Sequence, residues 1–110
     1  MTDEQHFARP TPVTALDLAF GGDIGKLMPD YKNLPEEFRR ERDPWSRLIH
    51  KWFFSGLDTS SLKPKEGIDK VVALKHCQAI MCSFSPKHEH KIAGVAWLMS
   101  QWFEEPEHVQ

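Results

Sequence analysis

Apolar residues recur at helical spacing along much of this 110-residue chain, and that periodicity constrains its fold more than any other feature. The segment DPWSRLIHKWFFSGL, residues 43–57, places apolar side chains at i, i+3, i+4, i+7 and i+8. They are Trp45, Leu48, Ile49, Trp52 and Phe53. This spacing puts them on one face of an α-helix. Alternation with a period of two never persists for five residues, so strands are not expected and an all-α fold is predicted.

Capping signals set the predicted ends of three helices. Asp43 suits the N-cap of the first, Pro44 its first turn and Gly56 its end. The second helix is predicted over about 67–84, with a buried stripe made of Ala73, Cys77, Ile80, Met81 and Phe84. The third is predicted from Ser85 as N-cap to about Phe103. Because almost no loop separates the last two, they should form an antiparallel hairpin or a sharp corner.

One small domain is expected, because 110 residues suffice for a single hydrophobic core. We predict a bundle of four to six helices over 13–104, with a short first helix in TPVTALDLAFGG. Residues 1–12 are predicted to form an extended arm, because Pro10 and Pro12 disfavour helix before them. Residues 105–110 are predicted to form an acidic tail.

Composition narrows the functional classes. Hydrophobic residues make up 40% of the chain, and no stretch approaches the roughly 18 apolar residues of a membrane span. The acidic, polar N-terminus is unlike a secretory signal, so a cytoplasmic protein without membrane contact is predicted. The net charge is −2, with a mildly basic middle between acidic ends. Cys77 and Cys82 would point about 140° apart on a helix, which argues against a disulfide between them.

The run His88-Glu89-His90 is the most conspicuous group of ionisable residues. In a helix the two histidines lie about 200° apart and cannot chelate one metal ion, although they would do so in a strand. We interpret the run as the solvated first turn of the last helix, with Glu89 favourable at the positive helix end. A partner-binding role, or a metal-assisted enzyme that uses His88 or His90, stays an alternative. No catalytic residue, resident metal or cofactor is predicted.

A second candidate site is the basic and aromatic segment EFRRERDPWSRLIHKW. Its bases could contact a nucleic-acid backbone. They are Arg39, Arg40, Arg42, Arg47 and Lys51. Glu36, Glu37, Glu41 and Asp43 nearly cancel these charges, and the tryptophans lie on the apolar stripe. Nucleic-acid binding is therefore the alternative hypothesis and not the first.

Aromatic residues support the first hypothesis, which is protein interaction. Phe54 and Trp97 lie off the main stripes of their helices, so apolar surface continues around them. Such a helix is buried centrally in its own domain or against a partner, which includes a second copy of the chain. We predict Phe54, Trp97 and Trp102 as partner anchors. The polar run Lys87, His88, Glu89, His90 and Lys91 is the predicted rim.

Three segments resemble small proteins that bacteriophages and prophages encode and that are not tied to a known activity. They are RPTP…ALDLAFGGDIGKLMP, PEEFRRERDPW…KWFFSGL and FSPKHEHKIAGVAWLMSQWF. The resemblance implies a bacterial, cytoplasmic setting and an accessory role between phage and host. It carries over no catalytic or binding residue.

Overall fold

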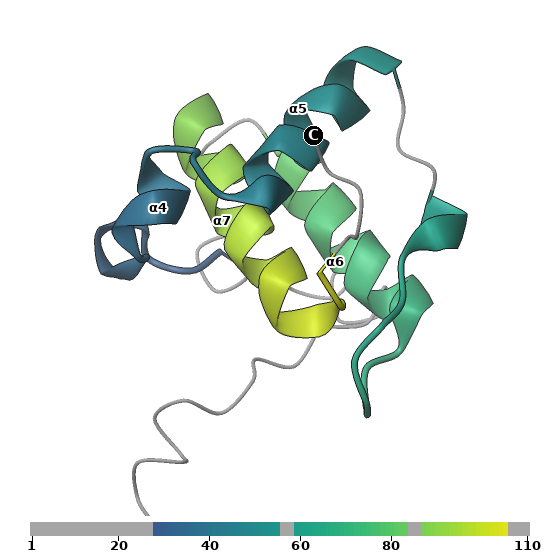
Figure 1. Cartoon of the computed structure of the whole chain (residues 1–110). Helices are drawn as coiled ribbons and strands as arrows, with labels where there is room; N and C mark the ends of the chain where they lie inside the picture. The colour runs from purple at the N-terminus through teal and green to yellow at the C-terminus, as the bar shows by residue number, and fades with distance from the viewer. Residues whose placement is uncertain (1–27, 56–58, 84–86, 106–110) are drawn as a thin grey trace, which may run out of the picture.

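The computed structural model describes residues 28–55, 59–83 and 87–105 of the chain, with the other segments drawn in grey (Figure 1). The predicted arm at 1–12, the predicted first helix and most of the predicted acidic tail therefore lie outside the described residues. So does the side chain of Phe54.

The described residues form a helical fold, as predicted. Three α-helices exceed one turn, α5 (Pro44–Ser55), α6 (Lys70–Cys82) and α7 (His88–Trp102). The shorter elements are α4 (Glu36–Arg39) and the 3-10 helices η1 (Tyr31–Asn33) and η2 (Thr59–Ser61). These three helices are fewer than the four to six predicted for residues 13–104, of which residues 13–27 lie outside the described ranges. Its β structure is limited to an isolated antiparallel bridge between Pro64 and Phe103.

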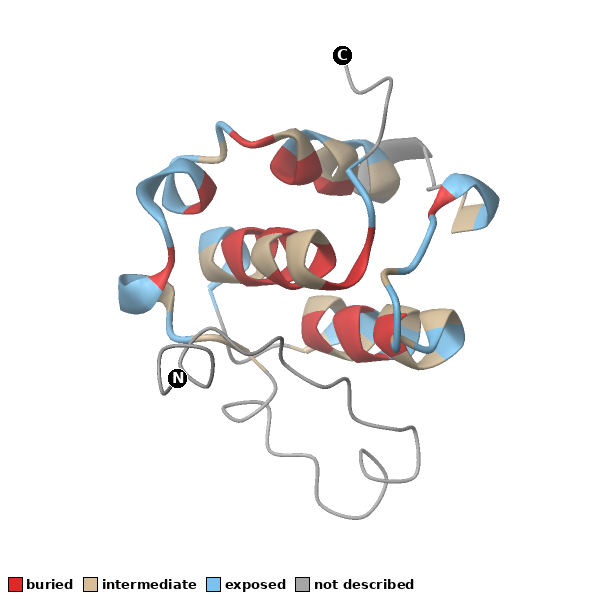
Figure 2. Cartoon of the chain, turned by 60° about the horizontal axis from the view of Figure 1, so that its bottom comes forward, coloured by how far each residue is buried: buried red, intermediate tan, exposed pale blue. Residues whose placement is uncertain are grey.

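Helix α7 lies at the centre of the fold, and the other elements pack around it (Figure 2). Eight of its fifteen residues are buried, and they are Ile92, Ala93, Gly94, Val95, Ala96, Leu98, Met99 and Trp102. Helices α4, α5 and α6 and the 3-10 helix η1 all contact it. The apolar residues of α7 lie on more than one of its faces, and neighbouring elements pack against several of its sides. This is the pattern of a central helix. Its apolar faces are therefore covered within one chain.

A small residue on α7 allows close approach of the chain that precedes η1. A Cβ atom built at Gly94 would lie 3.4 Å from Pro29 Cδ and 3.5 Å from Met28 Cε. The element that lies against Gly94 is therefore this irregular segment, which packs over the middle of α7.

Helices α6 and α7 run in opposite directions and pack together, which is the predicted hairpin (Figure 1). Two of its predicted ends were wrong. Helix α6 begins at Lys70, because Asp69 accepts hydrogen bonds from the backbone N–H groups of Val71 and Val72 and forms the N-cap. Helix α7 begins at His88 with Lys87 at the N-cap, so Ser85 does not hold that position.

The end of α7 is fastened to the segment that precedes α6. The backbone N–H of Lys65 donates to the carbonyl of Trp102, and that of Glu104 donates to the carbonyl of Lys63, both at 2.8 Å. The Lys65 ammonium also donates to the carbonyl of Ser100 at 3.0 Å. Pro64 fits the middle of this pairing because neither ladder bond uses its nitrogen.

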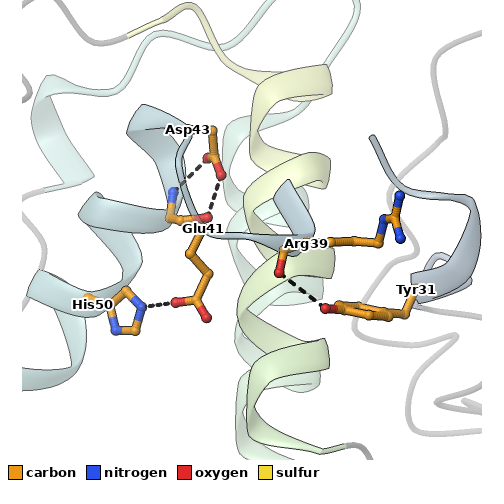
Figure 3. A network of polar contacts seen from close by, with 6 residues as sticks. Tyr31, Arg39, Glu41, Asp43 and His50 are labelled. Atoms are coloured by element: carbon orange, nitrogen blue, oxygen red, sulfur yellow. Dashed lines mark hydrogen bonds and ion pairs between the residues drawn. The ribbon is translucent and has the colours of Figure 1, made fainter. Parts of the chain in front are cut away.

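The corner between α4 and α5 has a left-handed residue that is not glycine. Glu41 has φ 55°, and the N–H groups of Glu41 and Arg42 donate to the carbonyls of Phe38 and Glu37. These two bonds are the Schellman pattern that ends a helix, in which glycine usually holds the left-handed position. The Glu41 carboxylate pairs with His50 on α5, which gives glutamate a partner at this corner (Figure 3).

Asp43 fixes the start of α5, as predicted. The residue is 2% exposed, and its carboxylate accepts from the Ser46 backbone N–H at 2.7 Å and from the Ser46 hydroxyl at 2.5 Å (Figure 3). Ser46 is itself fully buried. Without these donors, the buried carboxylate would carry a desolvation cost that no hydrogen bond offsets. The same holds for the Ser46 donors without this acceptor.

We expect Asp43→Ala to lower the free energy of unfolding by about 2 kcal/mol, because it removes an N-cap and leaves two buried donors unpaired. Asp43→Asn keeps an acceptor for the Ser46 N–H and should lose about half as much. Urea unfolding followed by far-UV circular dichroism measures both. Equal losses for the two variants would contradict the capping role.

Candidate interaction surface

An apolar hollow of about 240 Å³ lies between α5 and α6. Its lining residues are Ile49 and Trp52 from α5, and Gln78, Met81 and Cys82 from α6. Ile49 is fully buried and forms the floor, whereas Trp52 and Met81 are half-buried. Gln78 and Cys82 are exposed, so the hollow opens to solvent on the α6 side.

The hollow exists because α5 and α6 pack mainly on α7 and little on each other. Helical spacing then aims their side chains into the space between them. Ile49 and Trp52 stand at i and i+3 on α5, and Gln78, Met81 and Cys82 at i, i+3 and i+4 on α6. Among the described residues that line the hollow, four are aliphatic, aromatic or sulfur-containing, and Gln78 supplies a side-chain amide.

The two cysteines occupy opposite environments, and both are free thiols, in agreement with the predicted absence of a disulfide between them. Cys77 is fully buried in the core. Burial raises the pKa of its thiol to about 12, because the charged thiolate would lose its hydration. Cys82 is exposed at the edge of the hollow.

The predicted aromatic anchors do not form a common surface. Trp102 is 0% exposed and packs in the core, where its ring centroid lies 5.0 Å from that of the buried His76. It is therefore a core residue and not a surface anchor, because α7 is central. Trp97 is half-buried and packs against the same core. The side chain of Phe54 lies outside the described residues.

The residues of the polar run at 87–91 differ in their contacts and in their exposure. The Lys91 ammonium donates to the carbonyls of Met81 at 3.3 Å and Ser83 at 2.9 Å, so it caps the end of α6. The His90 ring stacks on Tyr31 with centroids 4.0 Å apart. Lys87, His88 and Glu89 are exposed. Lys91 is thus a structural residue of the hairpin, which the sequence pattern did not indicate.

The bases of the predicted nucleic-acid segment are exposed but partly engaged. Arg39 donates through Nε to the carbonyl of Leu34 at 3.0 Å, and its own carbonyl accepts from the Tyr31 hydroxyl at 3.1 Å (Figure 3). Arg40 pairs with Glu36 at 2.9 Å, one helical turn away. Arg42, Arg47 and Lys51 are exposed on the corner and on α5. Arg39 and Arg40 therefore have polar partners within the chain.

Sequence reasoning assigned Trp52, Ile49 and Met81 to buried stripes and missed the hollow between them. One signal for it was present. Gln78 interrupts an apolar run on α6, and a polar residue beside Met81 and Cys82 marks the side of the helix that reaches solvent.

Two further findings concern function classes. Within the described ranges, no group of three or more His, Cys, Asp or Glu side chains is placed to hold a metal ion. None of the described helices combines the length and the hydrophobicity that a membrane crossing needs.

Comparisons with protein-family models, with curated proteins and with solved structures found no match to the chain.

The environments of the cysteines predict one reactive thiol in the native protein. At pH 8 only about one Cys77 thiol in ten thousand would be ionised, because its pKa is about 12. We expect a chromogenic disulfide reagent to modify one thiol per native chain and two in guanidinium. Cys82→Ser should leave no reactive thiol before unfolding. Two fast thiols in the native protein would contradict the burial of Cys77.

Replacement of Lys91 tests its capping role. Lys91→Met keeps most of the side-chain length but removes two charge-assisted hydrogen bonds, and we expect the free energy of unfolding to fall by about 1–2 kcal/mol. The control is Lys75→Met on the exposed side of α6, which should change it by less than about 0.5 kcal/mol. Equal small effects in urea unfolding would show that Lys91 does not secure the hairpin.

Proposed function

We propose that this protein is a small helical interaction module that binds a macromolecular partner through the hollow between α5 and α6. The observation that carries the proposal is the presence of half-buried Trp52 and Met81 beside an open apolar space. Tryptophan is enriched among the residues that dominate interface energies, and methionine adapts its shape to different partners.

The size of the hollow supports a side chain as its occupant. Its volume of about 240 Å³ is below the roughly 300–1,000 Å³ of typical small-molecule sites. It would accept one or two apolar side chains from a partner surface. The energy of such an anchor comes from apolar area removed from water, about 25 cal/mol per Å².

The setting that we propose follows from the resemblance to phage and prophage proteins. An accessory protein of that kind acts by occupying a surface of a host or phage macromolecule, in the bacterial cytoplasm. It needs no catalytic group for this. Nucleic-acid binding through Arg39, Arg40, Arg42, Arg47 and Lys51 is the competing proposal. It has less support because Arg40 is paired with Glu36 and because Glu37, Glu41 and Asp43 lie in the same segment.

A comparative pull-down tests the proposal. Wild-type protein, Trp52→Ala and Trp97→Ala are immobilised and exposed to nuclease-treated and untreated bacterial lysate, and bound proteins are identified by mass spectrometry. We expect to recover a protein that binds the wild type and Trp97→Ala in both lysates. Its recovery should fall at least about tenfold with Trp52→Ala, as expected when a buried aromatic anchor is removed.

A second variant protects this test against misfolding of Trp52→Ala. Cys82→Phe adds a large side chain at an exposed position on the rim and should fill the hollow without loss of core contacts. It should release the same partner. Retention of the partner by both variants would overturn the proposed site. Binding that disappears only with nuclease would support the arginine-rich segment instead.

A further inference from the structure

We propose that the partner segment is an acidic amphipathic helix, which places one apolar side chain in the hollow and a second on Val71. This inference rests on the proposed function and adds the chemistry of the partner. Three features carry it, namely the charge of α5 and α6, the position of Val71 and the positions of Lys75 and Lys91.

The two helices that frame the hollow carry basic residues and no acidic ones. Helix α5 carries Arg47 and Lys51, helix α6 carries Lys70 and Lys75, and neither helix contains Asp or Glu. The whole chain has 16 acidic and 14 basic residues, so the absence of acids is a local feature of these two helices. Complementary charge on a partner would favour association with it and orient the encounter.

Lys75 and Lys91 place positive charge at the two ends of the hollow. Lys75 is exposed on α6 three positions before Gln78, which places it one turn from the hollow on the same side. Lys91 donates to the carbonyls of Met81 and Ser83 at the other end. Carbonyls are neutral acceptors, so these bonds leave the charge of the ammonium in place.

Arg47 and Lys51 contribute at longer range. They lie off the apolar stripe of α5, about one helix diameter, or about 10 Å, from the hollow. The carboxylates that cap the two helices are farther away or already engaged. Asp69 begins α6, about 20 Å from Cys82 along the helix, and Asp43 is buried against Ser46. Glu41 is paired with His50 on α5.

Val71 gives the surface a second apolar point. Its side chain is 59% exposed, more than any other large hydrophobic residue in the described part of the chain. It precedes Gln78 by seven positions, so it lies on the same face of α6, two turns or about 10 Å away. A helix laid along α6 could match this spacing with apolar residues at i and i+7, and an acid between them would face Lys75.

A second copy of the chain fits this face poorly, because contact through α6 would bring Lys75 and Lys91 of both copies into one interface. Like charges at such positions oppose association. Nucleic acid would complement the positive charge of α5 and α6, but it has no apolar side chain to fill a hollow lined by Ile49 and Met81. An acidic peptide with apolar residues satisfies both features.

The test uses the full chain and a matched pair of fluorescent peptides. Each peptide has about 16 residues and two leucines two turns apart on an alanine background, with glutamates in one peptide and lysines at the same positions in the other. Binding is measured by fluorescence anisotropy in about 50 mM and about 500 mM salt. Alkylation of Cys82 is timed with and without peptide.

We expect the glutamate peptide to bind at least about tenfold more tightly than the lysine peptide in low salt, with a smaller ratio in high salt. It should slow the alkylation of Cys82. Lys75→Glu and Val71→Ser should each weaken its binding at least about fivefold. Lys63→Glu, an exposed charge reversal outside α5 and α6, should not.

Several results would overturn the inference. Equal binding of the two peptides, or binding that does not protect Cys82, would refute the proposal of an acidic partner. The proposed function would still stand in that case if Trp52→Ala released a protein in the pull-down. Protection of Cys82 by a single-stranded oligonucleotide but not by the glutamate peptide would favour nucleic acid. Protection that rises with protein concentration alone would favour a second copy.

Discussion

The burial of α7 is the interaction on which the other parts of the structure depend. Its apolar residues contact α4, α5 and α6 on different sides, and Gly94 lets Pro29 close over its middle. Because α5 and α6 both use α7 as their support, they stand apart from each other at the surface. The hollow is the space that this arrangement leaves, so the candidate site is a consequence of the way the core is built.

Polar contacts then fix where the supported helices begin and end. Asp43 and Ser46 set the start of α5, the pair of Glu41 and His50 holds the corner that precedes it, and Lys91 closes the end of α6. Each contact is local in the chain and partly or fully shielded from water, which makes such bonds more effective than those on an open surface. Together they position the two helices from which Trp52 and Met81 line the hollow.

The sequence predicted the helical class, the Asp43 cap and the hairpin, because these follow from local spacing and short-range capping. It misplaced the start of α7, where Ser85 was predicted as the N-cap and Lys87 holds that position. It also interpreted Trp102 as a surface anchor, because periodicity shows that a helix is apolar all round but not what covers it. The hollow joins residues of α5 and α6 that are about 30 positions apart in sequence, and local patterns carry no information on such pairs.

The chain order of the helices also bears on biosynthesis. The ribosome makes α5 and α6 before α7, yet α7 is the helix on which both of them pack. Until it emerges, Ile49 and Ile80 have no core to enter and their helices expose apolar surface. The pairing of 63–65 with 102–104 must come later still. A nascent chain of this protein therefore passes through a stage at which chaperones have reason to bind it.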